Sequence, residues 1–121
     1  MKNTLFALPV LAAIAMAPTA ASAETDSERK IYEAVQNQQW DVAEKLLREG
    51  LQLNPGDPKQ LLNLAYILQN SDRKAEAADI YARVLTLDSN PIVTMDSDAK
   101  VRAKGLARER MASIYLSQRQ N

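Results

Sequence analysis

The sequence predicts an all-α fold: a short α-solenoid of two antiparallel helix hairpins followed by one long C-terminal capping helix. Among 121 residues there are only 3 Gly, 5 Pro and 5% aromatics, and helix-forming residues such as Ala, Leu, Gln, Glu, Lys and Arg are abundant. A repeat is the second observation, because Ala43 and Ala77 lie 34 residues apart. The same offset relates the pairs Leu46/Ile80, Leu47/Tyr81, Gly50/Val84, Leu51/Leu85, Leu53/Leu87 and Asn54/Asp88. A repeat of this length is typical of stacked helix pairs.

The charge and the missing residue types argue against several functions. The chain has 15 basic and 15 acidic residues, and because nucleic-acid surfaces usually carry a basic excess, nucleic acid is not an expected partner. It has no His and no Cys, so it lacks the commonest general base, the thiol nucleophile and the soft metal ligands. The three glycines are isolated from one another, which excludes a glycine-rich phosphate loop. We therefore predict no enzymatic activity, no catalytic residue, no cofactor and no metal.

The first 23 residues have the pattern of a secretory signal peptide. A short basic lead precedes an almost wholly apolar run over 4–17, and the small-x-small motif Ala21-Ser22-Ala23 stands before Glu24. The apolar run is shorter than the roughly 20 residues that a membrane span needs. We expect export and cleavage, with a product that is not embedded in the membrane. A Gram-negative periplasm is the preferred destination, and secretion is the alternative.

Helix start and stop signals divide the rest into two hairpins, about 24–56 and 57–90. Thr25 and Glu28 form a capping box at the first helix, and Asp41 is the expected N-cap of the second. Asp57 followed by Pro58 begins the third helix. The predicted turns lie at 37–39, 54–56, 71–72 and 88–91.

Residues 91–121 are expected to form a loop and the capping helix. No strand signal is evident, and 98–118 is predicted to be one helix with an apolar face. Part of this helix copies the third helix at an offset of 47: Met111, Ala112, Ile114 and Tyr115 align with Leu64, Ala65, Ile67 and Leu68. A third unit therefore begins here and stops after one helix, as a cap that would cover the apolar end of the array.

This pattern resembles the tetratricopeptide repeat, a 34-residue helix pair. The resemblance covers about residues 31–89, and its first helix fits only with a turn one residue short, so the register of that helix stays open. The positions that match the family's structural signature are Trp40, Ala43, Leu47, Gly50, Pro55, Leu61, Leu64, Ala65, Leu68, Ala77, Tyr81 and Val84.

The resemblance implies that the first helix of each pair lines a concave groove for an extended peptide or a partner helix. In the second unit the matching positions are expected to be exposed, with Leu62 and Tyr66 as anchors and Asn63 and Gln69 as partners of a peptide backbone. An alternative places Tyr66 against the capping helix. The candidate groove residues are Lys59, Leu62, Asn63, Tyr66, Gln69 and Asn70, with Arg29 and Glu33 from the first unit.

The function that we expect is therefore an exported adaptor that binds another protein without chemistry of its own. Self-association is a second hypothesis, because residues 24–57 carry a net charge of −4 and residues 98–121 a net charge of +4. Such ends would suit a self-assembling structural subunit. A small-ligand carrier or a weak hydrolase is the alternative from a different class.

Overall fold

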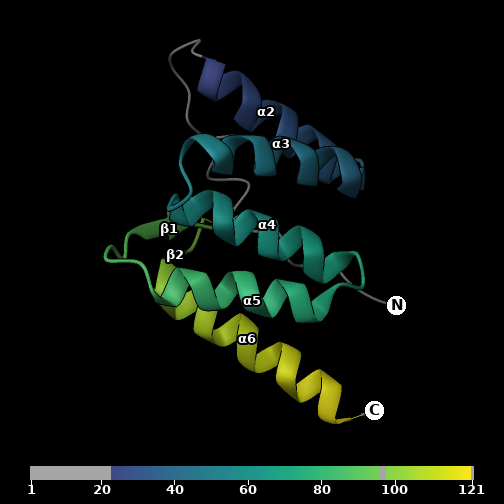
Figure 1. The fold of residues 1–121 in the computed structure, drawn as a ribbon, viewed down its shortest axis with the longest axis vertical. Helices are drawn as coiled ribbons and strands as arrows, with labels where there is room; N and C mark the ends of the chain where they lie inside the picture. Colours follow the sequence, from purple (N-terminus) through teal and green to yellow (C-terminus); the bar gives the residue numbers. More distant parts are fainter. Residues whose placement is uncertain (1–22, 96–97, 121) are drawn as a thin grey trace.

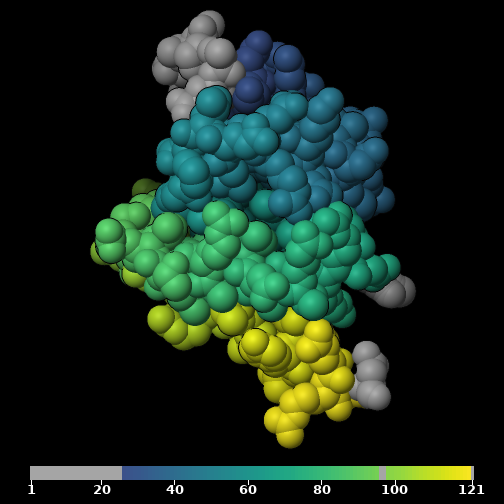
Figure 2. All heavy atoms as spheres, viewed as in Figure 1, coloured from purple at the N-terminus to yellow at the C-terminus, as the bar shows by residue number. Residues whose placement is uncertain are grey.

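The computed structural model describes residues 23–95 and 98–120. In that part of the chain the helices follow one another as α2 (Ala23–Gln36), α3 (Trp40–Leu53), α4 (Pro58–Asn70), α5 (Lys74–Leu85) and α6 (Ala103–Arg119). Figure 1 shows them stacked in sequence order, with α2 at one end and α6 at the other. The space-filling view shows the same order as successive layers along the long axis (Figure 2). The prediction of an all-α solenoid of helix hairpins is confirmed. The predicted signal peptide lies, apart from Ala23, outside the described residues.

The start of α4 follows the sequence prediction closely. Asp57 is its N-cap, and one carboxylate oxygen accepts from the backbone N–H groups of Lys59 and Gln60 at 3.0 and 3.4 Å. The Gln60 amide donates to the other oxygen at 3.0 Å. Pro58 has no N–H to leave unpaired at the first helical position. This cap fixes where α4 begins and therefore sets the direction in which each of its side chains points.

The start of α3 differs from the prediction. The helix begins at Trp40 with Gln39 as its N-cap, and no side chain caps it. Asp41 is not the cap; it lies in the first turn, where its negative charge still suits the positive end of the helix dipole. The preceding turn closes through Gln38, whose φ of 56° lies in the left-handed region. Asp72 has the same conformation, with φ 59°, between α4 and α5.

Residues 91–102 contain a short β-hairpin that was not predicted. Strand β1 (Ile92–Thr94) pairs antiparallel with β2 (Lys100–Arg102), with Val93 opposite Val101. The three consecutive β-branched residues of β1 favour an extended backbone, and Val93 buries its side chain in the core. Because β2 takes up residues 100–102, α6 begins at Ala103 and not at residue 98.

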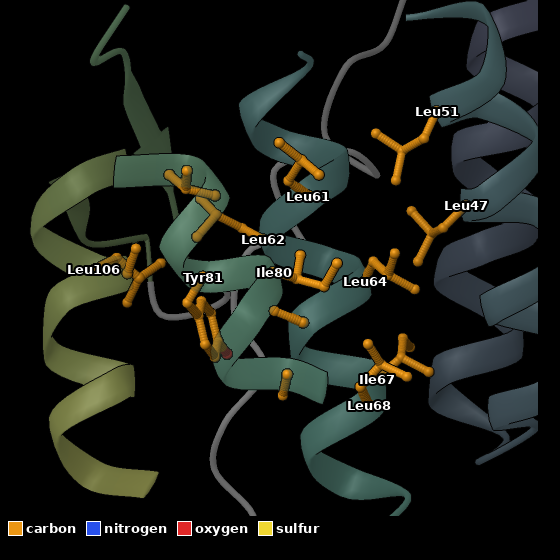
Figure 3. Packing of buried hydrophobic residues seen from close by; sticks show 14 of the residues in the cluster. Leu47, Leu51, Leu61, Leu62, Leu64, Ile67, Leu68, Ile80, Tyr81 and Leu106 are labelled. Carbon is orange, nitrogen blue, oxygen red and sulfur yellow. The ribbon is translucent and has the colours of Figure 1, made fainter. Parts of the chain in front are cut away.

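The core is built from leucine, isoleucine and alanine on facing sides of neighbouring helices. Leu47 and Leu51 of α3 point toward α4, and Leu106 of α6 lies against α5 (Figure 3). Five alanines are completely buried and let the helices approach closely; they are Ala43, Ala65, Ala77, Ala103 and Ala107. No helix within 23–95 or 98–120 is both long and apolar enough to cross a membrane.

Gly50 lies where α3 passes close to the side chain of Gln60 at the start of α4. A Cβ atom added at Gly50 would lie against the side-chain amide of Gln60, far inside contact distance. That amide donates to Asp57, so an added Cβ would displace the Gln60 side chain from this hydrogen bond. The glycine therefore serves packing, and its backbone φ is not positive.

Four charged side chains link α3 to α5. Arg73 pairs with Glu44 at 2.7 Å and with Glu76 at 2.9 Å. Arg48 completes the ring, 2.8 Å from Glu44 and 3.0 Å from Glu76. Partial burial by itself would raise the pKa of Glu44, but the hydrogen bonds from Arg73 and Arg48 outweigh it and hold the pKa below its ordinary value of 4.5. The network ties the second helix of one hairpin to the second helix of the next.

We expect Glu44→Gln to lower the free energy of unfolding by up to about 1 kcal/mol at neutral pH. The loss is no larger because both arginines that pair with Glu44 are about half exposed, and water weakens such ion pairs. Because the folded-state pKa is lowered, the stabilisation by Glu44 is present above the ordinary value of 4.5 and is lost as the pH falls through the lowered value. Urea unfolding of both proteins at about pH 7 and about pH 3 measures this. A difference that does not shrink in acid would contradict it.

Candidate functional site

The candidate site lies on α4, the central helix of the stack. It packs on α3 and α5 and also contacts α6, so it has neighbours on more sides than any terminal helix. The predicted groove residues recur on it at helical spacing, since Lys59, Asn63, Tyr66 and Asn70 follow one another at intervals of three or four. One stripe along α4 therefore carries most of the candidate residues.

Lys59 connects the beginning of this stripe to α2. Its ammonium nitrogen lies 3.3 Å from a carboxylate oxygen of Glu28, and the two side chains are 34% and 17% exposed. This ion pair joins the first helices of the two hairpins, α2 and α4. The ion pair also offsets the charge of Lys59, so this end of the stripe is less basic than the sequence alone suggests.

Tyr66 lies halfway along the stripe and packs against an aromatic neighbour. Its ring meets that of Trp40 edge to face, with the ring centroids 6.3 Å apart and the planes at 74°. Both side chains are partly buried beside the core. Such a pair typically contributes about 0.5–1.5 kcal/mol beyond its buried area. Tyr66 is thereby held by the start of α3, a placement that neither sequence alternative included.

Asn63 is the most unusual residue of the stripe. Its side chain is 0% exposed, and it is the only polar residue in the core of the described part of the chain. Neither its amide nitrogen nor its amide oxygen has a hydrogen-bond partner there. A buried polar group left unpaired costs about 1–3 kcal/mol, so its presence needs a reason. Asn63 therefore offers one donor group and one acceptor to a ligand that can reach it.

The structure differs from the sequence prediction on the exposure of Leu62 and Asn63. Both were expected on an open surface, but they are 1% and 0% exposed. Leu62 points from α4 toward α5 and joins the core (Figure 3). The physical reason is the central position of α4, which packs on α3, α5 and α6, so more than one stripe of it is covered.

The far end of α4 is tied to α5. The Tyr81 hydroxyl donates to the side-chain oxygen of Gln69 at 3.0 Å. Burial raises the pKa of Tyr81 strongly, against a smaller opposing effect of the Arg110 charge, so its hydroxyl stays protonated and keeps donating. The Asn70 side chain donates to the Tyr66 backbone oxygen at 2.8 Å. Gln69 and Asn70 thus stabilise the C-terminal end of α4 and its contact with α5.

The two candidates from the first hairpin lie apart from this stripe. Arg29 pairs with Asp26 at 3.0 Å and with Glu33 at 2.8 Å, all along exposed α2. These hydrogen bonds raise the pKa of Arg29. The structure does not bring Arg29 and Glu33 into contact with α4 side chains through any hydrogen bond or ion pair between described residues. They form a local charged surface on α2.

Several contributors to the site were not named from the sequence. Glu28 was interpreted as a capping residue, and Trp40 and Tyr81 as part of the repeat signature. Their contacts with α4 depend on how α2, α3 and α5 pack around it, which local periodicity does not encode. Among residues 23–95 and 98–120, no three acidic side chains gather in a way that could hold a metal ion.

One family model matches the chain: a tetratricopeptide repeat model covers residues 34–93. No curated protein and no solved structure matches the chain. The matched segment contains the whole of α3, α4 and α5, the helices that carry the 34-residue repeat. It includes the cap at Asp57, the buried alanines of the two hairpins and the candidate stripe on α4. Residues 34–93 therefore belong to the tetratricopeptide repeat family.

Proposed function

We propose that this protein is a non-catalytic adaptor that binds an extended segment of another protein along α4. Tetratricopeptide repeats generally mediate protein–protein interaction. The observation that carries the proposal is the unpaired amide of Asn63, in the middle of the stripe between Lys59 and Tyr66. A metal or a small anion would need several charged ligands converging there. A single amide side chain can instead form hydrogen bonds with the amide groups of a peptide backbone.

The chemistry of an amide side chain fits a peptide backbone. An extended segment presents N–H and C=O groups, and Asn63 can donate to one and accept from the other. Tyr66 and Trp40 supply an aromatic surface beside it, of the kind that anchors partner side chains. Because Asn63 is fully buried, a bound segment reaches it only when the side chains around it move apart. The segment then replaces the missing hydrogen bonds and removes the cost of leaving them unmade.

We further propose that the adaptor works outside the cytoplasm, in the periplasm, with secretion as the alternative. The support is the signal-peptide pattern of residues 1–23. Intact-mass analysis of the protein from its native host is expected to find Glu24 as the first residue. A soluble product that retains Met1 would contradict the export proposal without affecting the binding proposal.

Site-directed photocrosslinking in the native host tests the binding proposal. A benzoylphenylalanine at position 66 keeps an aromatic ring beside Trp40, and the matched control places the same group at Asp79, an exposed residue of α5. We expect position 66 to capture a discrete protein and position 79 to capture much less of it. Equal capture at both positions, or capture only from position 79, would contradict a binding site on α4.

A further inference from the structure

The outer face of α6 carries a regular row of exposed side chains. Glu109, Ala112, Leu116 and Arg119 are all exposed, and they follow one another at intervals of three, four and three residues. This spacing places the four residues along one side of the helix. Tyr115 borders the row, and Tyr115 and Leu116 are 54% and 60% exposed. They are the large apolar side chains that α6 exposes to water.

The corresponding face of α4 is buried, whereas no neighbouring element covers this face of α6 in the described part of the chain. Ala65 and Leu68 of α4 are both 0% exposed. Their equivalents at the offset of 47 are Ala112 and Tyr115, and both are exposed. Helix α6 packs on α5 and forms the last layer of the stack (Figure 1). Its other side therefore presents to solvent a face that the repeat covers elsewhere.

We propose that α6 pairs with α6 of a second copy of this chain, antiparallel, about a two-fold axis. Such an axis, level with position 114, sets Glu109 opposite Arg119 of the other copy, and Ala112 opposite Leu116. Each of these pairs of facing residues, called a layer below, occurs twice because both copies contribute the same surface. The two central layers combine a small side chain with a large one, which lets the helices approach and interdigitate. The two outer layers combine an acid with a base.

Charge favours the antiparallel pairing over the parallel one. A parallel pairing would set Glu109 against Glu109 and Arg119 against Arg119, which is repulsive at both ends of the row. Within the row, each charged residue of one copy meets the opposite charge of the other copy when the two helices run antiparallel, and exposed Arg108 lies beside the row. The interface is short, so the dimer is weak and forms at high protein concentration.

Sedimentation equilibrium over about 10 μM to about 1 mM protein tests this proposal. We expect the wild-type protein to dimerise and Glu109→Arg to weaken dimerisation about tenfold or more, because both acid–base layers become repulsive. We expect the same of Arg119→Glu. An equimolar mixture of the two variants should dimerise again, since each layer then joins Arg to Glu. Asp79→Arg, the same charge reversal on exposed α5, is the matched control and should dimerise as the wild type does.

Three results would overturn the proposal: a wild-type protein that stays monomeric throughout this range, a dimer that Glu109→Arg leaves intact, or two variants that fail to associate when mixed. Circular dichroism of each variant establishes that it is folded. The dimer does not depend on the proposed peptide site, because none of its four residues lies on α4. Its failure would therefore leave the photocrosslinking prediction standing, and the reverse also holds.

Discussion

Replacing Ala77 with Trp is expected to destabilise the protein by about 3 kcal/mol or more and to broaden or abolish its cooperative unfolding. Ala77 is 0% exposed in α5, and this helix makes its main contacts with α4 and α6. An indole at this position cannot fit without separating α5 from its neighbours. A domain of this size has only about 5–15 kcal/mol of stability to lose, so the substitution removes a large part of it.

Thermal and urea unfolding followed by circular dichroism measure this effect. Ala75→Trp is the matched control, because Ala75 lies in the same helix and is exposed. It should leave the unfolding midpoint nearly unchanged. Should Ala77→Trp melt as Ala75→Trp does, the close approach of α5 to its neighbours at this alanine would be wrong.

Replacing Asn63 with Leu is expected to stabilise the protein and to remove its binding function. The two side chains have the same branched arrangement of four heavy atoms, and Leu eliminates two buried polar atoms that have no partner among the described residues. The free energy of unfolding should rise by about 1–3 kcal/mol. Capture of the partner should fall about tenfold or more, because the hydrogen bonds to the bound segment cannot form. A change that improves stability while removing binding is typical of a functional residue.

The control for this variant is Asn37→Leu, which makes the same replacement at an exposed position after α2. It should change neither the stability nor the capture substantially. An Asn63→Leu protein that is less stable than the wild type would mean that the amide has partners in solution. An equally stable protein with undiminished capture would exclude Asn63 from the binding site.

Much of the fold could be predicted because its signals are local. The cap at Asp57, the turn at Ser71-Asp72 and the apolar spacing of α3, α4 and α5 each depend on residues within one or two helical turns of one another. The β-hairpin was missed because Ile92, Val93 and Thr94 are too few to show a strand period, and β2 lies in a stretch that also suits a helix. The start of α6 was misplaced for the same reason.

The site could be predicted only in part, because its geometry depends on long-range packing. The spacing of Lys59, Asn63 and Tyr66 indicated one stripe on α4. It did not indicate that Leu62 and Asn63 are covered, since this follows from how many helices surround α4. The pairing of Lys59 with Glu28, and of Tyr66 with Trp40, joins residues that no local pattern relates.

The central claim is that α4 holds an extended segment through Asn63. Linear peptides selected from a random library against the purified protein supply a probe without knowledge of the natural partner, and NMR chemical shifts report where they bind. The account predicts that the largest changes on titration occur at the Asn63 side-chain amide and at Tyr66, and that peptides selected in this way lose affinity for Asn63→Leu. Changes confined to α5, or to the outer face of α6, with Asn63 unaffected, would contradict it.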